Sequence, residues 1–275
     1  MTTIAVPPVL ARRRELMRSL DVTGQPIKFI AANWSSKVTA SEAERLIGAF
    51  SDGVITRTDL FHLGDLARAG DLADQRQLLI GTLLWGYGPR GGRSYINARR
   101  ALNAANLNQK LAACIAAIKR ADLRQAYLSL LGLPGYQEGY FTKYLYFAAR
   151  NAPWPSDCVK PLIFDSRVRA TLEFLARALG ANWESALPAR VAPFDRYQHY
   201  CQTVHRWADD LGFESGVSGA ERVEYALFRG DFVFDVYSEL RSLAAAAKRD
   251  LIENDAGPNL RAYAKSINQD LLESL

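Results

Sequence analysis

Residues 130–143 read LLGLPGYQEGYFTK and decide the fold, because a Leu-Pro-Gly turn stands between two helical segments. Apolar residues repeat at three- and four-residue spacing from about residue 122 up to the turn, and again after it to about residue 150. Gly132 and Gly135 are suited to ending one helix and forming a tight turn. The stretch therefore predicts a helical hairpin at residues 122–150.

A second short stretch, residues 162–168, reads LIFDSRV and places Asp165 between three apolar residues and the start of another helical pattern, which runs to about residue 179. A carboxylate at such a position can cap the helix by accepting hydrogen bonds from its first free amides. It can instead face a substrate atom on which positive charge develops. The residues alone leave both interpretations open.

The rest of the chain repeats its apolar residues in the same helical way, and alternating, strand-like stretches are scarce. Three prolines make residues 152–161 a loop. We find no linker of domain-separating length, so we expect one all-α unit over residues 1–275, which can be divided into two helical lobes around a cleft. One expected helix follows a capping box at residues 39–42. The other expected helices cover residues 9–20, 57–69, 73–85, 95–103, 107–119, 122–131, 138–150, 165–179, 193–211, 220–229, 231–253 and 258–275.

The composition excludes a disordered or fibrous chain, because 49% of the 275 residues are hydrophobic and only 23% are charged. No apolar run approaches the roughly 20 residues of a bilayer span. The three cysteines are far apart in the sequence, which favours a reducing compartment. We therefore expect a cytoplasmic protein with no membrane partner. The net charge of +5 suits a nucleic-acid partner but is also common among metabolic enzymes.

Several motifs that would indicate other chemistries are missing from the sequence. There is no Walker A pattern, no H-E-x-x-H and no nucleophile elbow. The histidines are His62, His199 and His205, and the last two are six residues apart, which does not suit a metal pair on one helix face. We expect no metal site and no cofactor.

The hairpin and the apolar-Asp segment together resemble the helix-hairpin-helix DNA glycosylase superfamily. The wider sequence, including LLWGYGPRGGRSYINARRAL and VHRWADDLG, resembles its bacterial branch labelled 8-oxoguanine-glycosylase-like, and within that branch the phage-defence glycosylases. The resemblance implies that Asp165 is the catalytic carboxylate and that the turn at residues 133–135 holds the backbone of double-stranded DNA. It also implies excision of a modified base that has been flipped out of the duplex, with glucosylated hydroxymethylcytosine as the first candidate and oxidised guanine as the second.

The chain departs from the family pattern at two positions. Gln137 stands where family hairpins usually have a second glycine. The lysine of members that also cleave the DNA strand lies four residues after the Leu-Pro-Gly glycine, and this chain has Gly139 there, so the family position does not predict strand cleavage. Lys143 lies one helical turn further along the same face and is either a nucleophile or a DNA-facing lysine.

Further candidate contacts follow from the resemblance and from residue chemistry. We expect the DNA backbone to be bound by amides and basic side chains at Gly135, Tyr136, Gln137, Gly139, Arg90, Arg93 and Arg167. The candidate pocket for the base consists of the aromatic residues Trp85, Tyr87 and Trp34, although Trp85 can instead be part of the core. The main alternative function is a non-catalytic helix-hairpin-helix DNA-binding protein in which Asp165 only caps a helix. An all-α enzyme that acts on small molecules is a weaker alternative.

Overall fold

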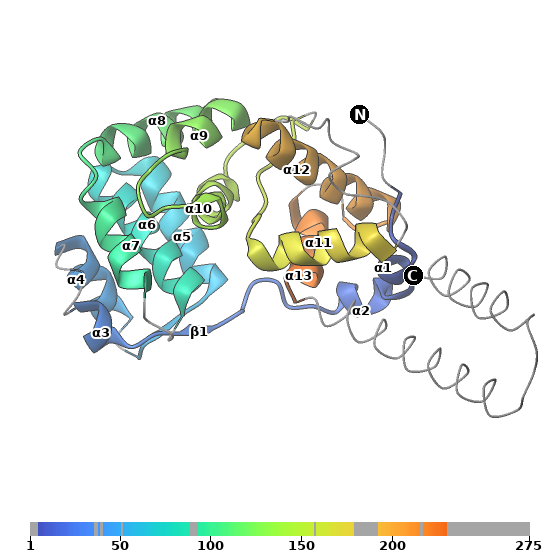
Figure 1. Ribbon diagram of the computed structural model, residues 1–275, viewed down its shortest axis with the longest axis horizontal. Coiled ribbons are helices and arrows are strands. Elements are labelled where there is room, and N and C mark those ends of the chain that lie inside the picture. Colours follow the sequence, from blue (N-terminus) through green and yellow to red (C-terminus); the bar gives the residue numbers. More distant parts are fainter. Residues whose placement is uncertain are drawn as a thin grey trace, which may run out of the picture. The chain divides into compact units, whose positions relative to one another are not determined.

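The computed structural model describes residues 5–35, 38, 41–50, 52–88, 93–156, 158–178, 192–214 and 217–229. Over these residues it contains thirteen helices and one sheet of two short strands (Figure 1). The prediction of an all-α fold is confirmed. Within the described part of the chain, none of the helices combines the length and apolar content that crossing a bilayer requires.

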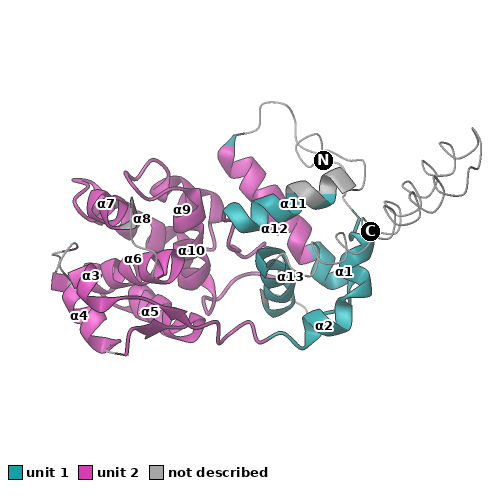
Figure 2. Ribbon diagram, turned by 60° about the horizontal axis from the view of Figure 1, so that its bottom comes forward, with its two compact units in different colours: residues 1–20, 166–192, 206–275 teal, residues 21–165, 193–205 magenta. Residues whose placement is uncertain are grey.

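The chain divides into two compact units (Figure 2). We call residues 21–165 and 193–205 the hairpin unit, and residues 1–20, 166–192 and 206–275 the terminal unit. The hairpin unit contains β1 (Ile27–Lys28), α3 (Ala31–Ser35), α4 (Ser41–Ala49), β2 (Val54–Ile55), α5 (Arg57–Ala69), α6 (Leu72–Tyr87), α7 (Arg93–Leu102), α8 (Leu107–Lys119), α9 (Leu123–Leu130), α10 (Glu138–Ala149) and most of α12 (Pro193–Asp210). The terminal unit contains α1 (Pro8–Arg12), α2 (Arg14–Arg18), α11 (Ser166–Ala178) and α13 (Val217–Arg229). The assignment of the whole chain to one glycosylase-like domain stays a prediction.

The longer helices lie where the sequence predicts them. Helices α5 and α8 have the predicted bounds, and α6, α7, α9, α10, α11, α12 and α13 differ from them by at most three residues at either end. A capping box at Thr56 and Asp59 fixes the start of α5, since each side chain accepts a hydrogen bond from the backbone of the other residue.

The prediction of a single helix at residues 9–20 is wrong. Arg13, with φ −96° and ψ 13°, leaves helical geometry and divides the segment into α1 and α2. Helix α3 and the strands β1 and β2, which pair antiparallel, were not expected, because two to five residues are too few to show a periodic pattern. The helices expected at residues 231–253 and 258–275 lie outside the described residues, as does residue 39 of the expected capping box.

Helix α10 lies at the centre of the hairpin unit (Figure 1). Every residue from Phe141 to Ala149 is buried, and α10 packs against α5, α6, α8 and α9. A helix that is apolar on nearly all sides is stable only when other helices surround it. Because α10 is held in place by its neighbours, the position of the hairpin turn that precedes it is also fixed.

The hairpin turn uses two glycines with backbone angles that other residues rarely adopt. Gly132 has φ +76° and Gly135 has φ +74°. Lys110 donates from Nζ to the carbonyls of Ser129 and Leu131 and so satisfies the end of α9. A Cβ at Gly135 would lie 2.3 Å from the carbonyl oxygen of Asn97, whereas a Cβ at Gly132 would meet nothing within 4 Å. Gly135 is therefore required both by its conformation and by the close approach of α7.

The two glycines provide a matched pair for testing the hairpin. Gly132→Ala is expected to lower the free energy of unfolding by about 1–2 kcal/mol, the cost of a left-handed conformation for a residue with a Cβ. Gly135→Ala is expected to cost about 1–3 kcal/mol more, because the added methyl group also collides with the backbone of Asn97. Urea unfolding of both variants measures the difference, and equal losses would contradict the proposed packing of the turn on α7.

Candidate active site

Lys143 and Asp165, which are 22 residues apart in the sequence, meet within the hairpin unit. Nζ of Lys143 donates to Oδ2 of Asp165 at 2.7 Å and to the carbonyl oxygen of Gly139 at 2.8 Å. The side chains are 4% and 14% exposed. A charged pair so little exposed to water interacts more strongly than one on the surface, and breaking it by removing one partner is costly. The structure therefore brings together both candidate catalytic residues.

Gly139 makes room for this contact. It lies one helical turn before Lys143 on α10, and a Cβ at this position would be 3.3 Å from Cα and 3.4 Å from Cβ of Asp165. These distances are tighter than most contacts of real Cβ atoms, so a larger residue would displace Asp165. The glycine thus has a packing role at the position where the family pattern has its lysine.

The segment before Asp165 is held by side chains that donate to or accept from its backbone. The hydroxyl of Tyr197 donates to the carbonyl of Leu162 at 2.8 Å, and that of Tyr200 donates to the carbonyl of Ile163 at 2.7 Å. The amide of Phe164 donates to Oγ1 of Thr142 at 3.1 Å. These bonds attach the segment that ends at Asp165 to helices α10 and α12, and so hold the Asp165 backbone in place.

The Tyr197 donor remains protonated at neutral pH. Tyr197 is fully buried, and its burial raises the pKa of the phenol well above its ordinary value. Neither Tyr197 nor Tyr200 was predicted from the sequence. Their partners are backbone carbonyls 35 and 37 residues away, and no local pattern indicates such a contact.

The aromatic candidates have different surroundings. Trp85 is 4% exposed, donates its indole N–H to the carbonyl of Gln25 at 3.3 Å and packs its edge on Phe147. Trp34 is 1% exposed and packs its edge on Tyr95. Burial of both rings favours the core alternative for these two tryptophans.

Tyr87, at the end of α6, is only partly buried. Its ring stacks on Tyr140 with 4.3 Å between centroids, and its hydroxyl accepts a hydrogen bond from Nδ2 of Asn97 at 3.2 Å. Nζ of Lys143 lies 5.7 Å from the centroid of the Tyr140 ring. Of the three predicted pocket residues, Tyr87 is the one that retains an exposed surface.

Some of the residues predicted to bind the DNA backbone lie at the start of α10, where an anion can bind. Gln137, its N-cap residue, is exposed, and its side chain makes no capping hydrogen bond. The helix dipole and the first amides of such a terminus favour a phosphate oxygen. Tyr136 does not share this arrangement, because its amide donates to the carbonyl of Leu133 and its buried hydroxyl is 2.6 Å from that of Thr82. We therefore leave Tyr136 out of the proposed DNA contacts.

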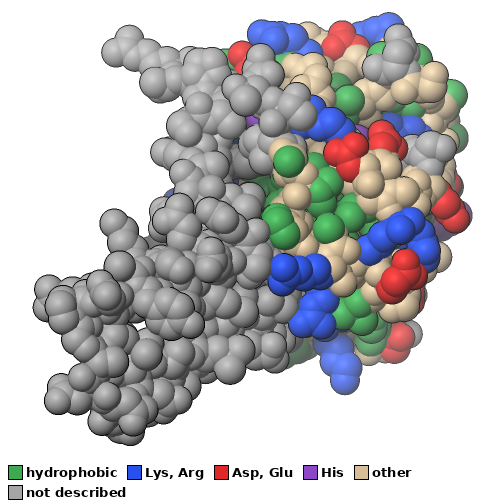
Figure 3. All heavy atoms as spheres, turned by 90° about the vertical axis from the view of Figure 1, so that its right-hand side faces the viewer, with side chains coloured by type: hydrophobic (Ala, Val, Ile, Leu, Met, Phe, Trp, Pro, Cys, Tyr) green, Lys and Arg blue, Asp and Glu red, His purple; other side chains and the backbone are tan. Residues whose placement is uncertain are grey.

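The three arginines predicted to bind the DNA backbone lie in different parts of the chain. Arg90 lies outside the described residues, and Arg93 is the first residue of α7. Arg167 is exposed in the terminal unit, with its guanidinium 5.1 Å from the ring centroid of Phe228. On the face drawn in Figure 3, basic side chains lie among acidic and apolar ones.

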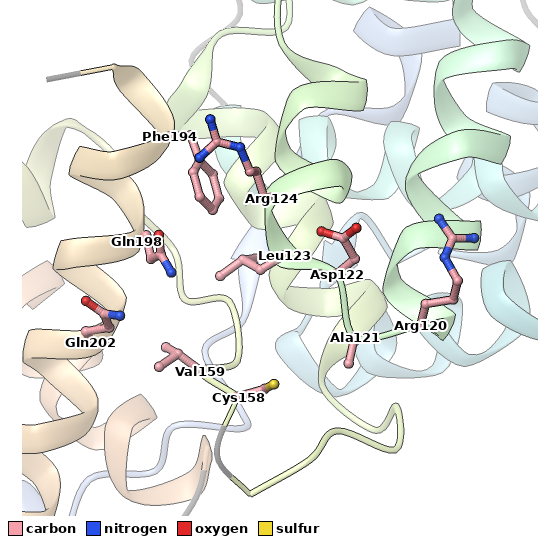
Figure 4. Close-up of a pocket in the computed structure, with 10 residues that line it drawn as sticks. All are labelled: Arg120, Ala121, Asp122, Leu123, Arg124, Cys158, Val159, Phe194, Gln198 and Gln202. Atoms are coloured by element: carbon pink, nitrogen blue, oxygen red, sulfur yellow. The ribbon is translucent and has the colours of Figure 1, made fainter.

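A separate cavity of about 620 Å³ lies among the turn between α8 and α9, the loop before Lys160 and the first turns of α12 (Figure 4). Its lining includes Arg120, Arg124, Gln198 and Gln202, and none of the candidate active-site residues.

No group of three or more His, Cys, Asp or Glu side chains among the described residues comes together in a way that could hold a metal ion.

The chain is similar to a family of known proteins. A family model described as "Putative 8-oxoguanine DNA glycosylase OGG-like protein" matches residues 20–228, well over half of the chain. Searches among curated proteins and among solved structures gave no match. The resemblance to the 8-oxoguanine-glycosylase-like branch is confirmed, and the resemblance to phage-defence members stays a prediction. The matched range includes the hairpin, Lys143 and Asp165, and the chain belongs to the OGG-like family of 8-oxoguanine DNA glycosylase-like proteins.

Proposed function

We propose that the protein is a DNA glycosylase in which Lys143 and Asp165 act on a nucleotide flipped out of DNA. The observation that carries the proposal is the 2.7 Å contact between Nζ of Lys143 and Oδ2 of Asp165, in a pair that is 4% and 14% exposed. An amine and a carboxylate at this distance can exchange a proton, and their burial limits access of water to the reacting atoms.

The proposed reaction begins with transfer of a proton from Lys143 to Asp165. The lone pair of the neutral amine then forms a bond to C1′ of the deoxyribose, and the bond from C1′ to the base breaks. The bonding electrons leave with the base, whose nitrogen takes up the proton that Asp165 had accepted. The carboxylate of Asp165 that this transfer restores stabilises the positive charge on the sugar and on the new ammonium group.

Strand cleavage follows from the same covalent intermediate. Opening of the sugar ring moves a proton from the new ammonium group to O4′ and turns the C1′–N bond into a protonated Schiff base. Asp165 then takes a proton from C2′, and the bond to the 3′ phosphate breaks with its electrons leaving on the phosphate. We propose that Lys143 takes this role from one turn beyond the family position, since Gly139 carries no amine. If Lys143 is instead a DNA contact, Asp165 would direct water at C1′ and the strand would stay intact.

Flipping a nucleotide out of the duplex costs a few kcal/mol of stacking and pairing. We propose that contacts with the DNA backbone offset part of this cost. The candidates are the turn at Gly135, the first amides of α10 at Gln137 and Gly139, and the side chains of Arg90, Arg93 and Arg167. Such contacts make binding weaker as salt is raised.

The proposed substrate is a modified base in double-stranded DNA. Oxidised guanine is supported by the description of the family. Glucosylated hydroxymethylcytosine is supported by the resemblance to phage-defence glycosylases, and with this substrate the protein would act in the cytoplasm against invading viral DNA. Both bases are planar and attached to C1′ through a ring nitrogen, so the chemistry at Lys143 and Asp165 is the same.

The test uses three duplexes, which contain 8-oxoguanine, glucosylated hydroxymethylcytosine or only unmodified bases. Mass spectrometry detects the free base, and alkali treatment reveals abasic sites. We expect release from at least one modified duplex and none from the unmodified duplex. Salt-dependent binding without release would favour a non-catalytic DNA-binding protein, and absence of binding at low salt would favour an enzyme that acts on small molecules.

Gly139→Ala is expected to lower base release by about 10- to 100-fold, because a displacement of the reacting groups by even 1 Å has effects of this size. The added methyl group would lie 3.3 Å from Cα of Asp165 and push it away from Lys143. Gly48→Ala is the matched control, since Gly48 is also helical and a Cβ there meets nothing within 4 Å. Release at the wild-type rate by Gly139→Ala in a single-turnover assay would contradict the proposed geometry.

A further inference from the structure

We infer that Tyr140, supported by Tyr87, provides the surface on which the flipped base stacks. The inference rests on the proposed function and adds to it a residue that determines how the base is held. We call the two rings the tyrosine pair. Tyr140 lies on α10 and Tyr87 at the end of α6, so the pair connects the helix of the candidate nucleophile with its neighbour.

The first argument is the short reach between the sugar and its base. A nucleobase bonded to C1′ extends only a few ångströms from that carbon, so a base whose C1′ is attacked by Lys143 must lie close to Nζ. Two aromatic rings have their centroids within 6 Å of this atom, among the ring contacts of the described residues. They are Tyr140, at 5.7 Å, and Trp85, at 5.9 Å.

The second argument concerns which of these two rings is open to a ligand. Trp85 is 4% exposed, its edge packs on Phe147, and its centroid is 5.5 Å from the guanidinium carbon of Arg57. Tyr140 and Tyr87 are both partly exposed. Of the two rings near Nζ, Tyr140 is therefore the one that combines closeness to Lys143 with an exposed surface.

The third argument is that the position of the tyrosine pair is fixed. Nδ2 of Asn97 donates to the hydroxyl of Tyr87 at 3.2 Å, and the two rings stack at an interplanar angle of 29°. Gly86 allows the close approach of Tyr140, because a Cβ there would lie 3.1 Å from Cε1 of that ring. A rigid aromatic surface loses little conformational entropy when a base stacks on it.

The hydroxyl of Tyr140 adds a polar group beside the stacking surface. Burial raises the pKa of Tyr140, and so do a hydrogen bond with Tyr87 and the negative charge of Asp165. The phenol therefore stays protonated at neutral pH. Because its one O–H is donated to Tyr87, its oxygen can accept a hydrogen bond from an N–H group of the base. Stacking itself accepts any planar base, so the expected ligand class is a purine or pyrimidine that carries an N–H donor.

The experiment compares Tyr140→Ala and Tyr140→Phe with the wild-type protein on two DNA duplexes. The first duplex contains a modified base that the wild-type protein releases, and the second contains tetrahydrofuran in place of that nucleoside. Tyr225→Ala is the matched control, because Tyr225 is also partly exposed and stacked, on Phe228, but lies in the terminal unit.

Tyr140→Ala is expected to weaken binding of the base-containing duplex and lower kcat/KM by about 10- to 100-fold, the usual range for loss of one base–aromatic stack. Its affinity for the tetrahydrofuran duplex should equal that of the wild-type protein, because that duplex has no base to stack. Tyr140→Phe keeps the ring and should retain most of the affinity, with a smaller loss that reports the hydroxyl.

Two results would overturn the inference while leaving the proposed function intact. One is release at the wild-type rate by Tyr140→Ala. The other is an equal loss of affinity by this variant for both duplexes, which would indicate a purely structural role. Failure of the wild-type protein to release any base would instead overturn the proposed function, and the inference with it.

Discussion

Asp165→Asn is expected to lower the rate of base release by about 10²- to 10³-fold, the usual effect of removing one group that stabilises charge as it develops in the transition state. Asparagine has nearly the same shape as aspartate and can still accept a hydrogen bond from Lys143. It cannot take up a proton from the amine, and it offers no negative charge to the sugar as the base leaves. A single-turnover assay on the best modified duplex measures the chemical step directly.

The control for this variant is Asp209→Asn, which removes an exposed carboxylate near the end of α12. Binding of Asp165→Asn to tetrahydrofuran DNA and its thermal unfolding should show that the fold persists. Full base release by Asp165→Asn from every substrate of the wild-type protein would leave the helix-capping role as the better account of this residue.

Lys143→Gln is expected to abolish the covalent intermediate and to lower base release by about 10²- to 10⁴-fold. Glutamine keeps most of the length of the side chain and can still donate to Asp165 and to the carbonyl of Gly139, so the local packing should change little. What it lacks is an amine that can attack C1′. The slow release that remains would come from water directed by Asp165, and it would produce an abasic site without strand cleavage.

Lys119→Gln is the matched control, since Lys119 is an exposed lysine at the end of α8. The expected pattern is strand cleavage by the wild-type protein and by Lys119→Gln, and none by Lys143→Gln. Unchanged strand cleavage by Lys143→Gln would mean that another amine forms the Schiff base.

Much of the fold could be predicted from the sequence, because local signals determine the long helices. Helix α5 begins at a capping box and α8 follows a clear apolar repeat, and both have the predicted bounds. The hairpin was predictable because Gly132 and Gly135 adopt conformations that favour glycine. The break at Arg13 and the two-residue strands were not predictable, because no periodic pattern indicates either of them.

The candidate site could be predicted only in part. Periodicity alone does not bring Lys143 and Asp165 together, because the loop at residues 152–161 separates them. The family resemblance indicated Asp165, and Lys143 was a candidate because it lies one helical turn after Gly139, on the same helix face. The packing role of Gly139 depends on a contact with Asp165 that lies outside its own helix. Trp85 was an ambiguous candidate because the same apolar run suits a core residue and a base pocket, and only its burial distinguishes them.

The most direct test of the reacting pair is trapping with sodium borohydride during base release, followed by trypsin digestion and mass spectrometry. Reduction of a Schiff base at Lys143 would block trypsin at that residue, so the DNA-linked peptide should span residues 125–150 instead of ending at residue 143. The account predicts this linked peptide from the wild-type protein and its absence from Lys143→Gln. Base release without a trapped peptide, or a linkage that maps to another lysine, would contradict it.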